Sequence, residues 1–184
     1  MKLSIDHIIL KCQRNEDQAQ RELYQLYSHV LFSICKRYAA NDDDAKDYFQ
    51  EGFITIFQKI DQYKFQGSFE GWAKRIMVNT CLEKLRKTEA IHDELNDNTI
   101  AGEEWIDEEA YTISYQELLD IVRQLPPQYR KVFNLYVFEE LKHQEIAQML
   151  GISVNTSKSN LARARQILVQ KVEDFNKKKN EENR

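Results

Sequence analysis

The sequence predicts an all-α protein made of two helical domains joined by a flexible acidic linker. Apolar residues recur at spacings of three and four in several separate segments, as expected when one face of each helix is buried. Only 2 of the 184 residues are proline and 30% are charged, which favours helices over strands. Residues 93–120 hold ten acids and no lysine or arginine. We therefore expect a first domain at residues 1–90, a linker at 91–111, a second domain at 112–176 and a tail at 177–184.

The formal net charge of −4 conceals an uneven distribution. The ten acids of residues 93–120 account for −10, so the rest of the chain carries +6 by difference. A mildly basic chain interrupted by one acidic segment is compatible with nucleic-acid binding, although the net charge alone argues against it.

The first domain is expected to consist of amphipathic helices. A short helix fits within residues 1–15, and a long one fits residues 16–38 with Asn15 as its cap. The acidic cluster at residues 41–44 suits the start of a helix over 45–60, because carboxylates favour the positive end of a helix macrodipole. The expected inward positions are Ile5, Ile8, Ile9, Leu23, Leu26, Tyr27, Val30, Leu31, Ile34, Tyr38, Phe49, Phe53, Ile56, Phe57 and Ile60.

Residues 61–71 are too polar for a buried strand and too rich in glycine for a helix, so we expect a loop. Tyr63, Phe65 and Phe69 alternate there with polar residues. Exposed rings in such a loop can stack unpaired bases, at ~1–3 kcal/mol per base, or the rings can anchor the loop to the core, as we expect for Phe69. Residues 72–87 follow as a helix with five cations and one acid, which fits a surface that tracks a nucleic-acid backbone.

Residues 125–171 carry the pattern of a helix-turn-helix, and residues 112–125 form a helix that leads into it. A double proline opens its first helix, Gly151 suits the left-handed residue of a tight turn, and Ser153 can cap the helix that follows. The second helix of such a motif enters the major groove of DNA. A bundle hairpin with a solvated basic face is the alternative. The cations Lys158, Arg163, Arg165 and Lys171, with no acid among them, and the polar residues Asn155, Thr156, Ser159 and Asn160 favour DNA.

Other functional classes find little support in the sequence. The four histidines are scattered, and no metal-ligand spacing, P-loop or nucleophile elbow is present, so we expect neither catalysis nor a cofactor. The three cysteines are widely spaced and are expected to be reduced thiols in helix cores. No signal peptide or membrane span is apparent, which makes the cytoplasm the expected location.

Two segments resemble one family in the right order. Residues 44–87, which include DAKDYFQEGFITIF and GWAKRIMVNTCLEKLRK, resemble region 2 of the extracytoplasmic-function sigma factors of bacterial RNA polymerase. Residues 125–171, which include HQEIAQMLGISVNTSKSNLARAR, resemble their region 4. The resemblance implies a sigma factor that binds core RNA polymerase, recognises the −10 and −35 promoter elements, melts the −10 region and starts transcription. It also implies a cognate anti-sigma factor as a partner, and no direct insertion into a membrane.

The resemblance further implies roles for individual residues. Those implied in binding core polymerase are Asp47, Gln50 and Glu51; those at −10 DNA are Tyr63, Lys64, Phe65, Gln66, Trp72, Lys74, Arg75 and Asn79; and those at −35 DNA are Asn155, Thr156, Lys158, Ser159, Asn160, Arg163 and Arg165. Family members often carry Val, Arg and His where this chain has Ser157, Asn160 and Ala162. We therefore expect Asn160 to set the −35 preference of this chain.

Three rival hypotheses remain open at the level of sequence. A helix-turn-helix regulator that acts on duplex DNA without joining a polymerase explains the second domain, but leaves the loop at 61–71 and its basic helix unexplained. An enzyme is the second rival. The third is an interaction module such as an anti-sigma protein, which would inhibit transcription instead of stimulating it.

Overall fold

The computed structural model describes residues 4–89 and 113–182, which form helices and turns and no strand. This confirms the all-α prediction. The chain divides into two compact units, Met1–Thr88 and Glu89–Arg184, in agreement with the expected pair of helical domains. The expected linker at residues 91–111 lies outside the described residues.

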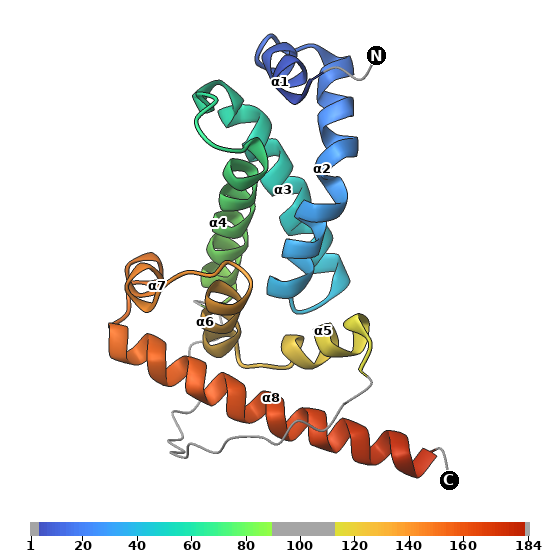
Figure 1. Ribbon diagram of the computed structural model, residues 1–184, viewed down its shortest axis with the longest axis vertical. Helices are drawn as coiled ribbons and strands as arrows, with labels where there is room; N and C mark the ends of the chain where they lie inside the picture. The colour runs from blue at the N-terminus through green and yellow to red at the C-terminus, as the bar shows by residue number, and fades with distance from the viewer. Residues whose placement is uncertain (1–3, 90–112, 183–184) are drawn as a thin grey trace. The chain divides into compact units, whose positions relative to one another are not determined.

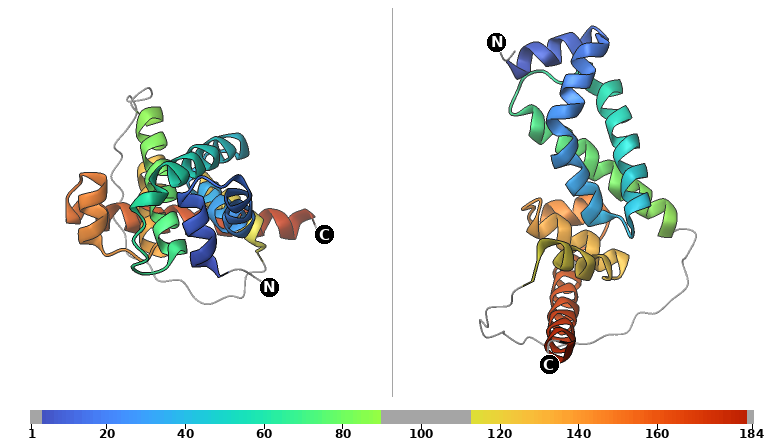
Figure 2. Two further views of the ribbon diagram at one scale, coloured as in Figure 1. Left: turned by 90° about the horizontal axis from the view of Figure 1, so that it is seen from above. Right: turned by 90° about the vertical axis from the view of Figure 1, so that its right-hand side faces the viewer.

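The described part of the first unit consists of α1 (Ile5–Gln13), α2 (Asp17–Tyr38), α3 (Asp42–Lys59), the 3-10 turn η1 (Ile60–Gln62) and α4 (Phe69–Glu89). The long helices α2, α3 and α4 lie alongside one another (Figure 1). Both η1 and the loop that follows it lie at the end of the unit where α1 packs, as the views of Figures 1 and 2 agree.

The core of the first unit is made by apolar side chains from its three long helices. Leu23, Leu31, Ile56, Met77 and Leu82 are each at most 1% exposed. Gly52 of α3 faces the buried Met77 of α4, and a Cβ atom at position 52 would overlap the sulfur of that side chain. A larger residue at this position would therefore force the Met77 side chain to move.

All three cysteines are free and buried, as the sequence indicated. Burial raises the pKa of the Cys12 thiol to about 11, and the nearby carboxylates of Glu16 and Glu22 add to that shift. Since the thiolate is the reactive form, Cys12 is held in its unreactive state. The sulfur atoms of Cys35 and Cys81 lie 3.9 Å apart in the core between α2 and α4.

The helix starts of the first unit are only partly as predicted. Asn41 caps α3 by accepting a hydrogen bond from the amide of Asp44 at 2.8 Å, so α3 begins at Asp42, earlier than expected. The prediction that Asn15 caps α2 is wrong. The cap position is Glu16, and Asn15 lies in the turn after α1 with φ of 60°, a left-handed conformation that asparagine tolerates better than most residues.

Spacing alone also misplaced some inward residues. Leu26 is 54% exposed although it fits the helical stripe of α2, because the covered arc of that helix runs through Leu23, Leu31 and Ile34 instead. In the second unit Leu118, which the helical spacing of residues 112–125 also predicts to face inward, is 43% exposed, and its neighbour Leu119 is buried in its place. A shift of one residue turns a side chain by about 100° on a helix, so a short periodic stretch fixes the buried face only approximately.

The described part of the second unit consists of α5 (Tyr115–Arg123), α6 (Pro127–Val137), α7 (His143–Leu150) and α8 (Val154–Glu182). The helices α5, α6 and α7 all pack along one side of α8 (Figure 1). Their shared core contains Val122, Leu125, Tyr129 and Ala164. Pro127 occupies the first turn of α6, where a missing amide hydrogen costs nothing.

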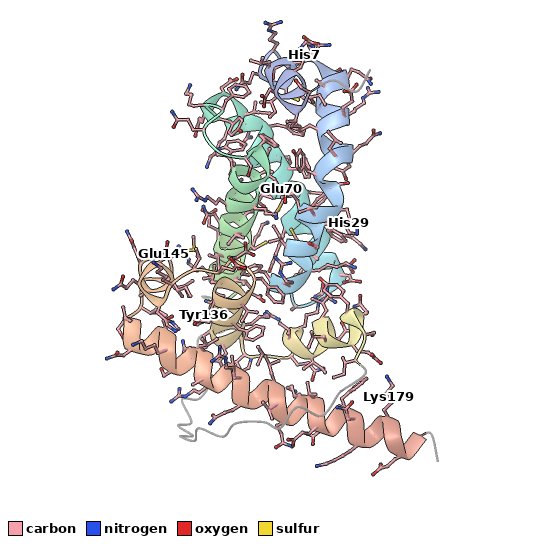
Figure 3. The ribbon with its side chains drawn as sticks, viewed as in Figure 1. His7, His29, Glu70, Tyr136, Glu145 and Lys179 are labelled. Carbon is pink, nitrogen blue, oxygen red and sulfur yellow. The ribbon has the colours of Figure 1, made fainter. Side chains whose placement is uncertain are left out.

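The end of the chain differs from the expected frayed tail, because α8 continues through residues 177–182. Lys179, labelled in Figure 3, bonds the Glu117 carboxylate of α5 at 3.3 Å and lies over the ring of Phe175. These contacts give the distal part of α8 a partner, which the lysine-rich composition of the segment did not indicate.

Candidate functional site

The outward face of α3 carries the residues predicted to bind a protein partner. Asp47 and Gln50 are exposed and Glu51 is half-buried. Because Asp47 and Glu51 are four residues apart, they lie on the same side of the helix, where both reach Lys84 of α4. The Lys84 ammonium lies 2.8 Å from Asp47 Oδ2 and also pairs with Glu51.

Lys84 is the least exposed member of this cluster, with a side chain 22% exposed against 62% for Asp47 and 45% for Glu51. Hydrogen bonds to the two carboxylates raise the pKa of Lys84 well above its ordinary value. The sequence suggested that Lys84 is one of the cations with which the helix over residues 72–87 follows a nucleic-acid backbone. In the structure, Lys84 is instead paired with the carboxylates on α3. The cluster therefore holds two carboxylates in fixed positions and leaves a net charge of −1.

An exposed isoleucine also belongs to this face, and the sequence reasoning missed it. Ile54 is 56% exposed on α3, four residues after Gln50 and three after Glu51. Those spacings place it among the polar residues and away from the buried stripe. The sequence alone shows these spacings, so they could have identified Ile54 as an exposed apolar residue. The face thus combines a fixed negative charge with an apolar centre, a composition suited to a protein partner.

The loop between η1 and α4 exposes one of its three aromatic rings. Phe65 is 40% exposed, whereas Tyr63 and Phe69 are each 4% exposed. The expectation that Phe69 anchors the loop is confirmed. Burial argues against the expectation that Tyr63 offers its ring to a base, because that ring packs against Phe69 and Trp72 at centroid distances of 5.3 and 5.6 Å.

Tyr63 instead shapes the loop from inside. Its hydroxyl donates a hydrogen bond to the carbonyl oxygen of Gly67 at 2.8 Å, and its ring supports that of Phe65 at 5.1 Å. Phe65 has φ of 58°, a left-handed conformation that costs an aromatic residue ~1–3 kcal/mol. Lys64 and Gln66, the two polar residues predicted to contact DNA, flank it and are both exposed.

The helix α4 brings together only some of its predicted DNA-binding residues. Arg75 and Asn79 are exposed, and their spacing of four residues places them on one face, with Trp72 half-buried at its start. Lys74 lies about 100° around the helix from Arg75. There it pairs with Glu70, labelled in Figure 3, at 2.6 Å. Lys74 is thus separated from the face that Arg75 and Asn79 share.

A separate candidate site, in the second unit, is a helix-turn-helix formed by α7 and α8. Gly151 ends α7 with φ of 68°, and Ser153 caps α8 by accepting from the amide of Thr156 at 2.9 Å, both as predicted. The outward face of α8 is exposed at Asn155, Thr156, Lys158, Ser159, Ala162 and Arg165. Polar and cationic side chains at the start of an exposed helix are what major-groove binding requires.

Two predicted residues of α8 depart from this picture. Asn160 is only 7% exposed, because its position in the register faces the core beside Ser157 and Leu161. This burial argues against the predictions that Asn160 contacts −35 DNA and sets the sequence preference. Arg163 is half-buried, and its guanidinium donates to the hydroxyl of Tyr129 at 3.3 Å, so part of this cation's bonding capacity is used within the unit.

A cluster centred on His143 joins α6, α7 and α8. The imidazole stacks on the ring of Tyr136 with centroids 4.8 Å apart, and its Nδ1 lies 3.0 Å from the hydroxyl of the buried Ser157. The guanidinium of Arg165 lies 5.7 Å from the centre of the Tyr136 ring. Partial burial, followed by the charges of Lys158 and Arg165, holds the pKa of His143 below its ordinary value of 6.5.

Across the described ranges 4–89 and 113–182, no group of three or more His, Cys, Asp or Glu side chains is arranged to hold a metal ion. The helices of the same ranges include none that is long and apolar enough to cross a membrane.

Comparison with known proteins assigns both units to one family. Residues 23–91 match the family described as Sigma-70 region 2, and residues 115–168 match Sigma-70, region 4. The RNA polymerase sigma factor SigV of Bacillus subtilis is 30% identical over 138 residues, which cover 75% of this chain and 81% of that protein. The chain belongs to the extracytoplasmic-function sigma factors.

Other relatives agree with this family assignment. The ECF RNA polymerase sigma factor SigW of B. subtilis is 27% identical over 95% of this sigma factor and 100% of its own length. The solved structure of the sigma factor RpoE from Bartonella quintana, in complex with the anti-sigma factor NepR, has a TM-score of 0.54 at 18% identity, covering 84% of this chain and 96% of that one. CnrH, in complex with the cytosolic domain of CnrY, has a TM-score of 0.52 at 17% identity, with coverages of 93% and 99%. These two structures share the fold.

The His143 cluster predicts how the stability of this sigma factor depends on pH. Because the pKa of His143 is lower in the folded chain than its ordinary value of 6.5, the unfolded chain takes up a proton first as the pH falls through 6.5. The free energy of unfolding that depends on His143 is therefore greatest above that pH and decreases below it. We expect His143→Gln to lose less thermal stability than the unsubstituted protein between about pH 7.5 and pH 5.5, as measured by circular dichroism.

His29, exposed on α2 of the first unit (Figure 3), provides the matched control. His29→Gln is expected to keep the pH dependence of the unsubstituted protein. Equal losses of melting temperature in His143→Gln and the unsubstituted protein would show that the cluster does not penalise protonation.

Proposed function

We propose that this sigma factor binds core RNA polymerase through the outward face of α3, opens the −10 element with its first unit and reads the −35 element with α8. The observation that carries the proposal is that one chain combines three features: an exposed ring at Phe65 in the loop before α4, the exposed Arg75 and Asn79 on α4, and a separate helix-turn-helix. A duplex-binding regulator needs the third feature but not the first two. The proposed domains are residues 1–90 for polymerase and −10 DNA and residues 112–176 for −35 DNA.

The free energies of base stacking and of base-pair melting indicate that promoter opening needs contacts from both the sigma factor and the polymerase. A base stacked on an aromatic ring gains ~1–3 kcal/mol, whereas taking it out of the duplex costs a few kcal/mol. Phe65 is the one ring of its loop that is exposed, with the amide of Gln66 beside it for contacts to a base edge. Capture by this loop alone does not offset the melting of several base pairs, so opening requires the contacts that core polymerase adds.

On α8 the proposed base-reading residues are Asn155 and Ser159, with Lys158 and Arg165 positioned for phosphates. Asn160 is left out of this set because it is buried. Asn155, Ser159 and Ala162 are spaced by four and three residues, so they line one stripe of the exposed face. The preference at −35 is therefore proposed to reside in that stripe.

The proposed partners follow from the family. We infer that the chain binds core RNA polymerase and promoter DNA in the cytoplasm, and that it contributes no catalytic residue of its own. RpoE and CnrH were each solved in complex with a second protein, NepR and the cytosolic domain of CnrY respectively. By analogy we propose that an anti-sigma protein restrains this chain. A regulator that acts without polymerase remains the alternative function.

Reconstituted transcription tests the proposed function. The purified chain is added to core RNA polymerase with a fragmented genomic library of its host, and run-off transcripts are sequenced. Transcripts that require the chain and share upstream elements at a common spacing are the expected result. Tight binding to duplex DNA by the chain alone, with no binding to core enzyme, would favour the regulator instead.

The polymerase-binding face gives a first variant. Glu51→Lys reverses a charge in the cluster and places a second ammonium beside Lys84, so we expect core polymerase to bind about tenfold more weakly. The affinity is measured with labelled protein and core enzyme in the absence of DNA. Glu83→Lys, at an exposed acid on α4, is the matched control and should bind as the unsubstituted chain does. Unchanged affinity of Glu51→Lys would place this face outside the interface.

The loop gives a second variant. Phe65→Ala removes the exposed ring, so promoter opening should fall about tenfold, in line with the loss of one stacked base, while core binding is retained. Opening is measured by permanganate reactivity of unpaired thymines. Phe65→Trp should retain opening because it keeps a stacking surface, and Leu26→Ala serves as a control for loss of an exposed apolar side chain. Equal losses of opening and core binding in Phe65→Ala would contradict base capture.

A further inference from the structure

The short helix α1 lies outside the residues that match either family region, which begin at residue 23. It packs on α2 through Ile8, Ile9 and Cys12, all buried. Its last residue, Gln13, does something different from these core contacts. The Gln13 side-chain amide reaches across to the start of the loop that carries Phe65.

Gln13 makes two hydrogen bonds to the backbone at that point. Its Nε2 donates to the carbonyl oxygen of Ile60 at 2.9 Å and to that of Tyr63 at 3.3 Å. Both acceptors are carbonyls, so only the NH₂ end of the amide fits. Ile60 is the first residue of η1 and Tyr63 follows its last, so one side chain spans the whole turn.

The second of these bonds fixes one end of the exposed part of the loop. The Tyr63 carbonyl is held by Gln13, and the Tyr63 hydroxyl is held by the carbonyl of Gly67 at 2.8 Å. Lys64, Phe65 and Gln66, all exposed, lie between these two fixed points. A left-handed Phe65 persists only where its surroundings determine the backbone, and the loop itself supplies few other contacts.

We infer that Gln13 is a positioning residue for the base-capturing loop, which makes α1 part of the −10 recognition machinery. Gln13 holds the backbone of Tyr63, and the ring of Tyr63 in turn supports the ring of Phe65. This inference rests on the proposed role of Phe65. The Ile60 carbonyl also accepts the amide of Tyr63 at 3.1 Å, and α1 keeps its apolar contacts without Gln13. Loss of the amide should therefore free the loop without unfolding the unit.

The test uses the full chain and two substitutions at one position. Gln13→Met keeps the length of the side chain and removes both donors. Gln13→Lys restores a donor that can reach the same carbonyls. The matched control is Gln18→Met on α2, where the amide bonds Glu22 on the surface. Three quantities are measured: amide hydrogen exchange of residues 60–69 in the free chain, promoter opening with core polymerase, and affinity for core enzyme.

We expect Gln13→Met to accelerate exchange in residues 60–69 and to reduce promoter opening by about threefold to tenfold, the range that one net hydrogen bond supplies. Its affinity for core polymerase should stay at the unsubstituted value. Gln13→Lys should recover most of the opening, and Gln18→Met should change none of the three quantities. A general loss of stability would instead lower core affinity together with opening, and lysine would not rescue it.

The outcomes separate this inference from the proposed function. Unchanged exchange in Gln13→Met, or unchanged opening where Phe65→Ala is defective, would overturn the positioning role alone. Phe65→Ala with normal opening would overturn base capture, and the positioning role with it. Faster exchange and weaker opening in Gln13→Met, rescued by lysine, would support both.

Discussion

The buried ring of Tyr63 is the contact on which the first unit's candidate site depends. It packs against Phe69 and Trp72 at the start of α4, and it supports the exposed ring of Phe65. Its hydroxyl and its carbonyl are both hydrogen-bonded, to Gly67 and Gln13 respectively. One side chain therefore links α1, η1, the loop and α4. Removing it would lose core packing and loop geometry together, so its substitution cannot separate stability from recognition, whereas Gln13 and Phe65 can.

The candidate surfaces on α3 and α8 are built in the same way but carry opposite charge. In each case a helix buries one stripe and presents polar residues on the other, and a side chain from a neighbouring element fixes part of the polar face. Lys84 does this for Asp47 and Glu51, and Tyr136 does it for Arg165. Holding a long side chain in place before binding reduces the entropy lost on binding. A surface pair contributes little to stability, so the value of these contacts lies in position rather than in folding energy.

Most of the fold and about half of the detail of the candidate site could be predicted from the sequence. Residues with a strong local cause were placed well: Gly151 at a left-handed turn, Ser153 as a cap, and Pro127 at a helix start. Phe69 was expected to anchor its loop, and its ring is buried. Local chemistry decides such positions, and a single sequence contains that information.

The errors share a different cause, which is that tertiary contacts decided them. Tyr63 and Asn160 look polar enough to face solvent, yet neighbouring elements cover them. Lys84 lies in a helix rich in cations, but its ammonium is paired with two carboxylates of another helix. Leu118 and Leu119 differ by one step around α5, and only the placement of α8 determines which of them is covered. Gln13 carries no local signal, because its partners are 47 and 50 residues away.

These corrections change the electrostatic account of promoter binding. With Lys84 paired on α3, Lys74 paired with Glu70 and Arg163 partly bonded to Tyr129, each unit offers only a few cations to phosphates. Each phosphate contact contributes about 0.9 to the slope of log affinity against log salt, so either unit alone should bind duplex DNA weakly at physiological salt. Two weak sites held on one scaffold bind far more tightly than either does alone, provided that their spacing matches the target. On the proposed function, core polymerase is that scaffold, and promoter selectivity then depends on the spacing between the −35 and −10 elements as much as on either surface.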